Sequence, residues 1–230
     1  MEMEIETIVS SNRYATYVKA IENALGEPCR ALSLELYEWN AELSGKMLFP
    51  FHIYEVTLRN CIAEALRERY SGNWPDNAAF INSLKPILKR KFIRARDKYY
   101  TPVGGSEGKL LAELSLSIYE SMLTSSQAPR LWIHKKAFEK VFPVAPVSPI
   151  PKNITYEEHI RKLVIDLQVG CNTIRKLRNR VAHHEPIFNK NDIHDVIPGV
   201  IKLLSWRSPT GCSWFKSNEL VSAVLKERLI

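Results

Sequence analysis

The amino-acid sequence predicts an all-α protein. Apolar residues recur at intervals of three and four along most of the chain, whereas no clear stretch alternates apolar and polar residues as a β-strand does. Glycine and proline gather between the periodic stretches, where they end one helix before the next begins. The helices expected from this pattern lie near residues 12–24, 29–45, 48–70, 77–99, 108–124, 133–140, 155–184, 190–205 and 216–228. The expected breaks contain Gly72, Pro75, Pro102, Gly104, Gly105, Pro209 and Gly211.

The expected helix at 48–70 carries a carboxylate on its apolar face. Glu55 projects from the middle of a face that is otherwise formed by Phe51, Leu58, Ile62, Ala65 and Leu66. Arg59 follows one turn later, within reach of an i,i+4 ion pair, and Asn60 is next to it. A carboxylate among apolar residues predicts a cationic partner from another element, since an unpaired buried charge is costly.

A basic segment occupies the expected helix at 77–99. Its cations are Lys85, Lys89, Arg90, Lys91, Arg94, Arg96 and Lys98. Such a run is either a solvated helix face or a surface that follows phosphates. Tyr99 and Tyr100 come directly after it and favour RNA, because bases can stack on their rings.

The segment from 142 to 151 predicts a stiff, extended crossover between two helices. It contains Pro143, Pro146, Pro149 and Pro151, which a helix interior would not tolerate. We expect the crossover to deliver the next helix across the bundle.

That next helix, at 155–184, has clear start and stop signals. Thr155 followed by Glu158 has the form of a capping box, and Pro186 predicts an end near His184. Between them runs an apolar stripe at helical spacing, formed by Ile160, Leu163, Val164, Leu167, Cys171, Ile174, Leu177 and Val181.

The closing end of this helix concentrates polar chemistry. Arg178 falls within the apolar stripe and therefore needs a carboxylate partner, while Asn179 and His183 lie one turn apart on a flank. His183 is in the last turn, where the helix dipole favours the imidazolium. We expect this helix to pack against the helix at 48–70, so that Glu55, Arg59, Arg178 and His183 form one polar pocket.

Two segments resemble the motifs of a known family. Glu55-Val-Thr-Leu-Arg-Asn60 and Leu177-Arg-Asn-Arg-Val-Ala-His-His-Glu-Pro-Ile187 are similar to the two motifs of the Abi-like (AbiD/AbiF-type) phage-defence proteins of the HEPN superfamily. Arg178-Asn-x-x-x-His183 resembles the HEPN ribonuclease motif. The resemblance covers most of the chain and includes Trp74, the 114–123 segment, Trp206 and Trp214.

The resemblance implies an HEPN-type helical bundle with additional peripheral helices. It further implies a homodimer that cleaves RNA without a metal ion, at a site assembled across the dimer axis, in abortive infection or as a toxin. An antitoxin or regulatory protein is a further partner that this class of protein can have. In related toxins a tyrosine two residues after the histidine is modified, but here Glu185 occupies that position, so we do not expect this form of control.

The residue types also suit RNA cleavage chemically. Attack of a 2′-hydroxyl on its phosphate needs a proton acceptor, a proton donor and cations that meet the developing charge. His183 suits the proton transfers and Arg178 the charge, Asn179 could fix the imidazole or a phosphate oxygen, and Glu55 could orient Arg178. Residues five apart on a helix diverge by roughly 140°. A twofold axis would remove this difficulty by bringing two helix ends around one groove.

Further substrate contacts are expected from polar and basic residues near these helices and on the basic segment: Arg59, Asn60, Arg175, Arg180, His184, Lys91 and Arg94. No cofactor is expected. No metal site is expected either, because zinc-binding helices use spacings such as His-Glu-x-x-His, which the sequence lacks.

Composition limits the class of protein. The 230 residues suit a single domain over 1–230, and the net charge of +7 favours a polyanionic partner without selecting RNA over DNA or an acidic protein. Four widely spaced cysteines are typical of reduced core residues. The acidic first residues, 1–6, are unlike a signal peptide, and no apolar run approaches the roughly 20 residues of a membrane span. We therefore expect a cytoplasmic protein without a membrane partner.

Two other classes of function remain open at this point. In the first, the protein is a non-catalytic RNA-binding or scaffold HEPN module in which Arg178 and Glu55 form a structural pair. In the second, it is a protein-interaction subunit of a defence complex, which predicts no salt-sensitive affinity for RNA.

Overall fold

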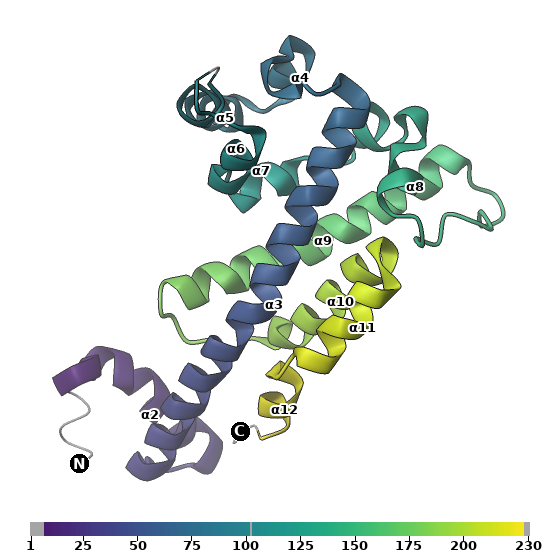
Figure 1. The fold of residues 1–230 in the computed structure, drawn as a ribbon. Coiled ribbons are helices and arrows are strands. Elements are labelled where there is room, and N and C mark those ends of the chain that lie inside the picture. The colour runs from purple at the N-terminus through teal and green to yellow at the C-terminus, as the bar shows by residue number, and fades with distance from the viewer. Residues whose placement is uncertain (1–6, 102, 228–230) are drawn as a thin grey trace.

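The computed structural model describes residues 7–101 and 103–227, and all regular structure within these ranges is helical (Figure 1). The all-α prediction is therefore confirmed. The α-helices are α2 (Ser11–Leu25), α3 (Arg30–Tyr70), α4 (Ala78–Ser83), α5 (Pro86–Tyr99), α6 (Glu107–Glu113), α7 (Leu116–Ser121), α8 (Ala137–Val141), α9 (Tyr156–Ala182), α10 (Val196–Arg207), α11 (Pro209–Asn218) and α12 (Val221–Lys226). Short 3₁₀ and π turns are η1 (Trp74–Asp76), η2 (Ala128–Trp132), η3 (His134–Lys136) and η4 (Asn191–Asp195).

Helix α3 joins the two helices that the sequence predicts at 29–45 and 48–70. Pro50 lies inside it and removes one backbone donor from the helix. Leu43, Met47 and Phe51, on either side of this proline, are all buried in the core. Tertiary packing thus keeps the helix continuous across the weak point, and the predicted break was wrong.

Two predicted helices are instead divided. The helix expected at 77–99 is split at Leu84 into α4 and α5, and Pro86 stands at the start of α5, where its missing donor costs nothing. The helix expected at 108–124 is split into α6 and α7 by the extended residue Leu114. Leu84 and Leu114 are both buried, so each break directs an apolar side chain into the core.

The C-terminal region also differs from the prediction. Pro209 and Gly211, expected to break the chain, belong to the first turn of α11. Ser208 caps this helix by accepting a hydrogen bond from the Gly211 amide at 3.1 Å. In place of one helix at 216–228 there are two, α11 and α12; residue 228 lies outside the described residues, as does the predicted breaker Pro102.

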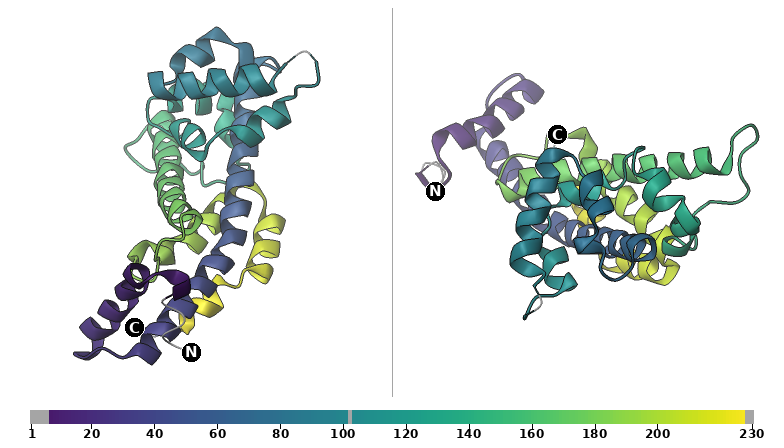
Figure 2. Two further views of the ribbon diagram at one scale, coloured as in Figure 1. Left: turned by 90° about the vertical axis from the view of Figure 1, so that its left-hand side faces the viewer. Right: turned by 90° about the horizontal axis from the view of Figure 1, so that it is seen from above.

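The long helices α3 and α9 form the centre of the molecule (Figures 1 and 2). Helix α2 packs near the N-terminal end of α3, α4 to α7 surround its other end, and α10 to α12 lie along its side. One connected cluster of buried side chains runs through these elements from Tyr17 on α2 to Val224 on α12. The Trp39 indole on α3 donates to the Val224 carbonyl at 3.0 Å, which fastens α12 to the central helix.

The proline-rich segment between α8 and α9 is non-helical, as predicted. Two contacts hold this segment against the rest of the fold. The Val144 amide donates to the Trp206 carbonyl at 3.1 Å, and the buried His159 ring lies 2.7 Å from the Pro146 carbonyl. The segment therefore fixes the start of α9 against α10.

All four cysteines are free, and Cys61, Cys171 and Cys212 are buried, as expected for core residues. Burial raises the pKa of the Cys61 and Cys171 thiols to about 12. Both are therefore protonated and unreactive near neutral pH. Among the described residues, no helix has both the length and the apolar character that crossing a membrane requires.

Candidate functional site

Helix α9 begins and ends as the sequence predicts. The Glu158 amide donates to the Thr155 hydroxyl at 3.2 Å, and the Thr155 amide donates to the Glu158 carboxylate at 2.7 Å, which completes the capping box. The hydrogen bonds that the Thr155 amide and hydroxyl donate to the Glu158 carboxylate lower the pKa of Glu158. At the other end, the last helical residue is Ala182, and His183 is the C-cap.

Helices α3 and α9 meet at a charged cluster, as predicted. Arg59 donates to the Glu55 carboxylate at 2.9 Å. The other carboxylate oxygen lies 3.6 Å from a guanidinium nitrogen of Arg178 on α9. Glu55 is therefore shared by two arginines from two helices, and its side chain is only 17% exposed.

Arg178 lies differently from what its place in the apolar stripe suggests. Its side chain is 45% exposed, whereas its neighbours on the stripe, Ile174, Leu177 and Val181, are buried. The buried face of α9 is thus narrower at this end than the sequence pattern suggests. The consequence is that a ligand in solvent can reach the Arg178 guanidinium, while the carboxylate behind it is mostly covered.

Arg59 is held from two sides. Its guanidinium pairs with Glu55, and its guanidinium carbon lies 5.7 Å from the centre of the Tyr119 ring on α7. Its Nε is buried and, within the described residues, has no hydrogen-bond acceptor. Burial raises the pKa of Tyr119, whose hydroxyl donates to the Leu111 carbonyl at 2.5 Å. Arg59 is therefore placed to orient Glu55 rather than to extend into solvent, whereas the neighbouring Asn60 is exposed.

Arg175 and Arg180 both have intramolecular partners. Arg175 donates to Glu120 on α7 at 2.5 Å. Arg180 donates to the Pro186 carbonyl at 2.9 Å and pairs with Glu185 at 3.0 Å, which closes the turn after the helix. Both arginines line a shallow hollow of about 390 Å³ together with Lys176, Leu177, Asn179, Lys190 and Asp192. The predicted residues Asn179, Arg175 and Arg180 thus gather beside the Glu55 cluster and not within it.

His183 is the fourth residue of the predicted pocket. Its side chain is exposed, and no hydrogen bond or ion pair among the described residues connects it to Glu55, Arg59 or Arg178. The reason is geometric, since five residues of helix turn the two side chains apart and the C-cap leaves the helical conformation. Ion pairs thus join three of the four residues expected in the pocket, Glu55, Arg59 and Arg178, and the place of His183 beside them stays a prediction.

His184 turns to another side of the molecule. Its φ of 54° is left-handed, which reverses the chain after α9. It lines a hollow of about 410 Å³ between α2, α3 and the end of α9, together with Arg13, Tyr37 and Glu185. His184 thus lines a different hollow from Arg175, Asn179 and Arg180.

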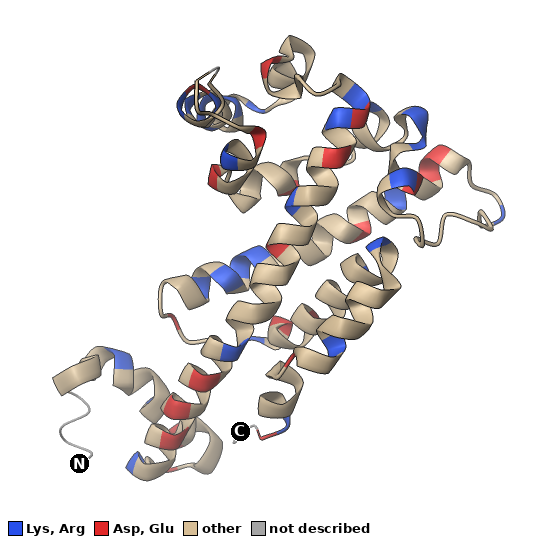
Figure 3. Ribbon diagram, in the orientation of Figure 1, with Lys and Arg blue, Asp and Glu red and all other residues tan. Residues whose placement is uncertain are grey.

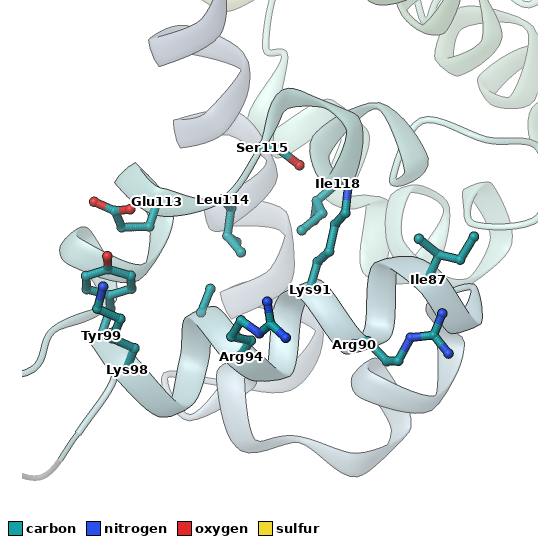
Figure 4. A pocket seen from close by; sticks show the side chains of 11 residues that line it. Ile87, Arg90, Lys91, Arg94, Lys98, Tyr99, Glu113, Leu114, Ser115 and Ile118 are labelled. Carbon is teal, nitrogen blue, oxygen red and sulfur yellow. The ribbon is translucent and has the colours of Figure 1, made fainter.

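Lys91 and Arg94 line a separate groove of about 550 Å³ between α5, α6 and α7 (Figure 4). Two other cations of the basic segment are already engaged, because Arg96 pairs with Asp97 at 2.6 Å and Lys89 donates to Asn82 at 2.7 Å. The groove is called the α5 groove below.

Helix α7 contacts the α5 groove, Arg59 and Arg175, and the sequence analysis did not predict these contacts. Consecutive residues serve three purposes, since Ile118 lines the α5 groove, Tyr119 lies under Arg59, and Glu120 holds Arg175. Tyr119 and Glu120 stand in a helix of only six residues. Nothing in such a short apolar stretch indicates which distant arginines its polar groups will meet.

Comparison of the chain with protein-family models, with curated proteins and with solved structures gives no match. The described residues also hold no group of three or more histidine, cysteine, aspartate or glutamate side chains placed to bind a metal ion.

Proposed function

We propose that the protein is a metal-independent endoribonuclease of the HEPN type, acting in the cytoplasm in phage defence or as a toxin. The observation that carries the proposal is the position of Arg178, whose half-exposed guanidinium stands over a covered carboxylate. Glu55 holds Arg178 at 3.6 Å, too far for a strong hydrogen bond, so the guanidinium keeps donors for a phosphate.

His183 supplies the proton chemistry in this proposal. Its imidazole is exposed at the end of α9 and makes no hydrogen bond or ion pair to another described residue. Both ring nitrogens are therefore open to a ligand. His183 accepts the proton of the attacking 2′-hydroxyl while the 2′-oxygen forms a bond to phosphorus. The imidazolium produced in this way protonates the 5′-oxygen as the bond from phosphorus to that oxygen breaks. The products are a 2′,3′-cyclic phosphate and a free 5′-hydroxyl.

Two copies of the chain are needed for this chemistry. Five residues separate Arg178 from His183, and ideal helix geometry turns such side chains apart by roughly 140°. A twofold axis that sets two α9 ends side by side would bring Arg178 of one copy next to His183 of the other. Asn179 lies between them in sequence and would face the same groove. The HEPN-type bundle and the homodimer are thus parts of one proposal.

The proposal is tested by incubating purified protein with total RNA in excess EDTA and identifying the new ends. Wild type should produce cyclic phosphates, and Arg178→Ala and His183→Ala should each lower the rate by about a hundredfold or more. His194→Ala is the matched control, because His194 is also exposed and makes no hydrogen bond or ion pair to another described residue. If His194→Ala lost as much activity as His183→Ala, the assignment of His183 to proton transfer would be contradicted.

One observation favours a second candidate, a non-catalytic RNA-binding or scaffold module. No hydrogen bond or ion pair among the described residues joins His183 to the Glu55 cluster, and a carboxylate between two arginines also occurs as a purely structural ion pair. This candidate predicts no cleavage by wild type and unchanged RNA affinity for His183→Ala. RNA affinity that does not depend on salt would instead point to a protein-interaction subunit.

A further inference from the structure

The α5 groove has cations at its rim and apolar side chains on its floor. Arg90, Lys91 and Arg94 stand on the rim, and all three are exposed. Leu114 and Ile118, which are buried, form part of the floor. Figure 4 shows Lys91 extending from α5 toward Ser115 and Ile118. The volume of about 550 Å³ is within the range of binding sites for small molecules or single nucleotides.

The rim cations are not neutralised by the protein itself. No ion pair or hydrogen bond within the described part of the chain engages the side chains of Arg90, Lys91 or Arg94, and the groove lining includes one carboxylate, Glu113. Arg90 and Arg94 are four residues apart on α5, where like charges repel and destabilise a helix. A bound polyanion would relieve this repulsion.

The apolar floor of the α5 groove favours single-stranded RNA over an anionic membrane surface as its ligand. A helix that lies on a membrane surface needs a protruding apolar face, whereas the apolar residue Phe92 of α5 is fully buried in the core. Leu114 and Ile118 are recessed below the cations, and Ile87, 61% exposed, stands at one end of the groove. A recessed apolar floor with charged walls suits an unstacked base and its phosphates, since every base offers an apolar face.

The α5 groove and the charged cluster around Arg178 share helix α7. Both α5 and the C-terminal half of α9 carry basic residues on the same side of the molecule in Figure 3. Helix α7 links them, because Ile118 belongs to the groove and the next residue, Tyr119, contacts Arg59.

We propose that the α5 groove binds single-stranded RNA flanking the phosphodiester that is cut, with Arg90, Lys91 and Arg94 contacting phosphates. This inference deepens the proposed function and rests on it for the identity of the ligand. It assigns the groove to substrate affinity and not to the chemical step.

Binding is measured by fluorescence anisotropy with a 2′-O-methyl single-stranded RNA, which cannot be cleaved by 2′-hydroxyl attack. The α5 variant replaces Arg90, Lys91 and Arg94 with glutamine. The control variant, Lys19→Gln, Lys152→Gln and Lys216→Gln, removes the same charge from exposed lysines on other elements. The α5 variant should weaken binding about tenfold or more. It should also make the plot of log affinity against log salt less steep by about 2, since each of the three lost phosphate contacts contributes roughly 0.7 to the steepness.

Ile87→Ser tests the apolar part of the groove. Because Ile87 is exposed, its loss should not disturb folding. It should weaken RNA binding about two- to fivefold while leaving the salt slope unchanged, as expected for a contact to a base and not to a phosphate.

Other outcomes overturn the inference in distinguishable ways. Equal losses for the α5 and control variants would show a general charge effect. If the α5 variant lost binding to vesicles of anionic lipid but kept its RNA affinity, the groove would be a membrane site. With cleavable RNA, the α5 variant should raise KM and keep kcat. If wild type bound RNA through the groove but cut nothing, the proposed nuclease activity would be wrong, whereas the proposal that the groove binds RNA would be retained.

Discussion

At the scale of single residues, Glu55 determines the candidate site. It is a carboxylate on the apolar face of α3, and two arginines from two helices converge on it. Arg59 contacts both Glu55 and the Tyr119 ring and therefore fixes the position of the Glu55 carboxylate. Glu55 in turn positions Arg178. The sequence could predict this pairing, because two charges in apolar surroundings need each other.

The positions of Arg178 and His183 relative to one another could be predicted only in part. Helical geometry indicates that the two side chains diverge. The exposure of Arg178 and the left-handed turn at His184 depend on how α9 packs against α3 and on Arg180 closing the next turn. These features arise from tertiary contacts that a repeating pattern does not encode.

Replacing Glu55 with glutamine tests its positioning role. Glu55→Gln should lower the rate of RNA cleavage about tenfold and the free energy of unfolding by about 1 to 2 kcal/mol, since two guanidinium groups lose a mostly covered partner. Glu64→Gln is the matched control on the same helix, because Glu64 pairs with Arg207 at a more exposed place. That control should cost about 0 to 1 kcal/mol and leave cleavage unchanged. An equal loss of cleavage in both variants would contradict the special role of Glu55.

At the scale of elements, local signals predicted α9 well and α3 poorly. The capping box and Pro186 act on their immediate neighbours, so the bounds of α9 follow from short sequence segments. Pro50 inside α3, the break at Leu84 and the start of α11 at Pro209 depend instead on which side chains the core accepts. Helix α7 is the extreme case, because its function as a link between two surfaces has no local signal.

The start of α9 gives a prediction about pH. The folded-state pKa of Glu158 is lowered by its hydrogen bonds with Thr155, so its carboxylate stabilises the fold above the ordinary glutamate pKa. This contribution is lost as the pH falls through the lowered value. The melting temperature of wild type should therefore exceed that of Glu158→Gln near pH 7, and the difference should shrink below about pH 4. A difference that grew on acidification would contradict the capping role.

At the scale of the whole molecule, a helical body presents two basic surfaces joined by α7. The all-α fold followed from periodicity, and the net charge of +7 predicted a polyanionic partner. The sequence could not predict that the basic segment faces a groove with an apolar floor, because α6 and α7 supply that floor. In the proposed site two chains supply Arg178 and His183, because no hydrogen bond or ion pair among the described residues joins these two side chains within one chain.

The most direct test of the central claim is the yield of 2′,3′-cyclic phosphate ends in EDTA from wild type, from Arg178→Ala, from His183→Ala and from a mixture of the two variants. Wild type should be active and each variant inactive. In the mixture, a dimer of unlike chains pairs an intact Arg178 with an intact His183, so a substantial part of the activity should return. An inactive wild type would contradict the nuclease, and an active wild type with an inactive mixture would contradict the shared site.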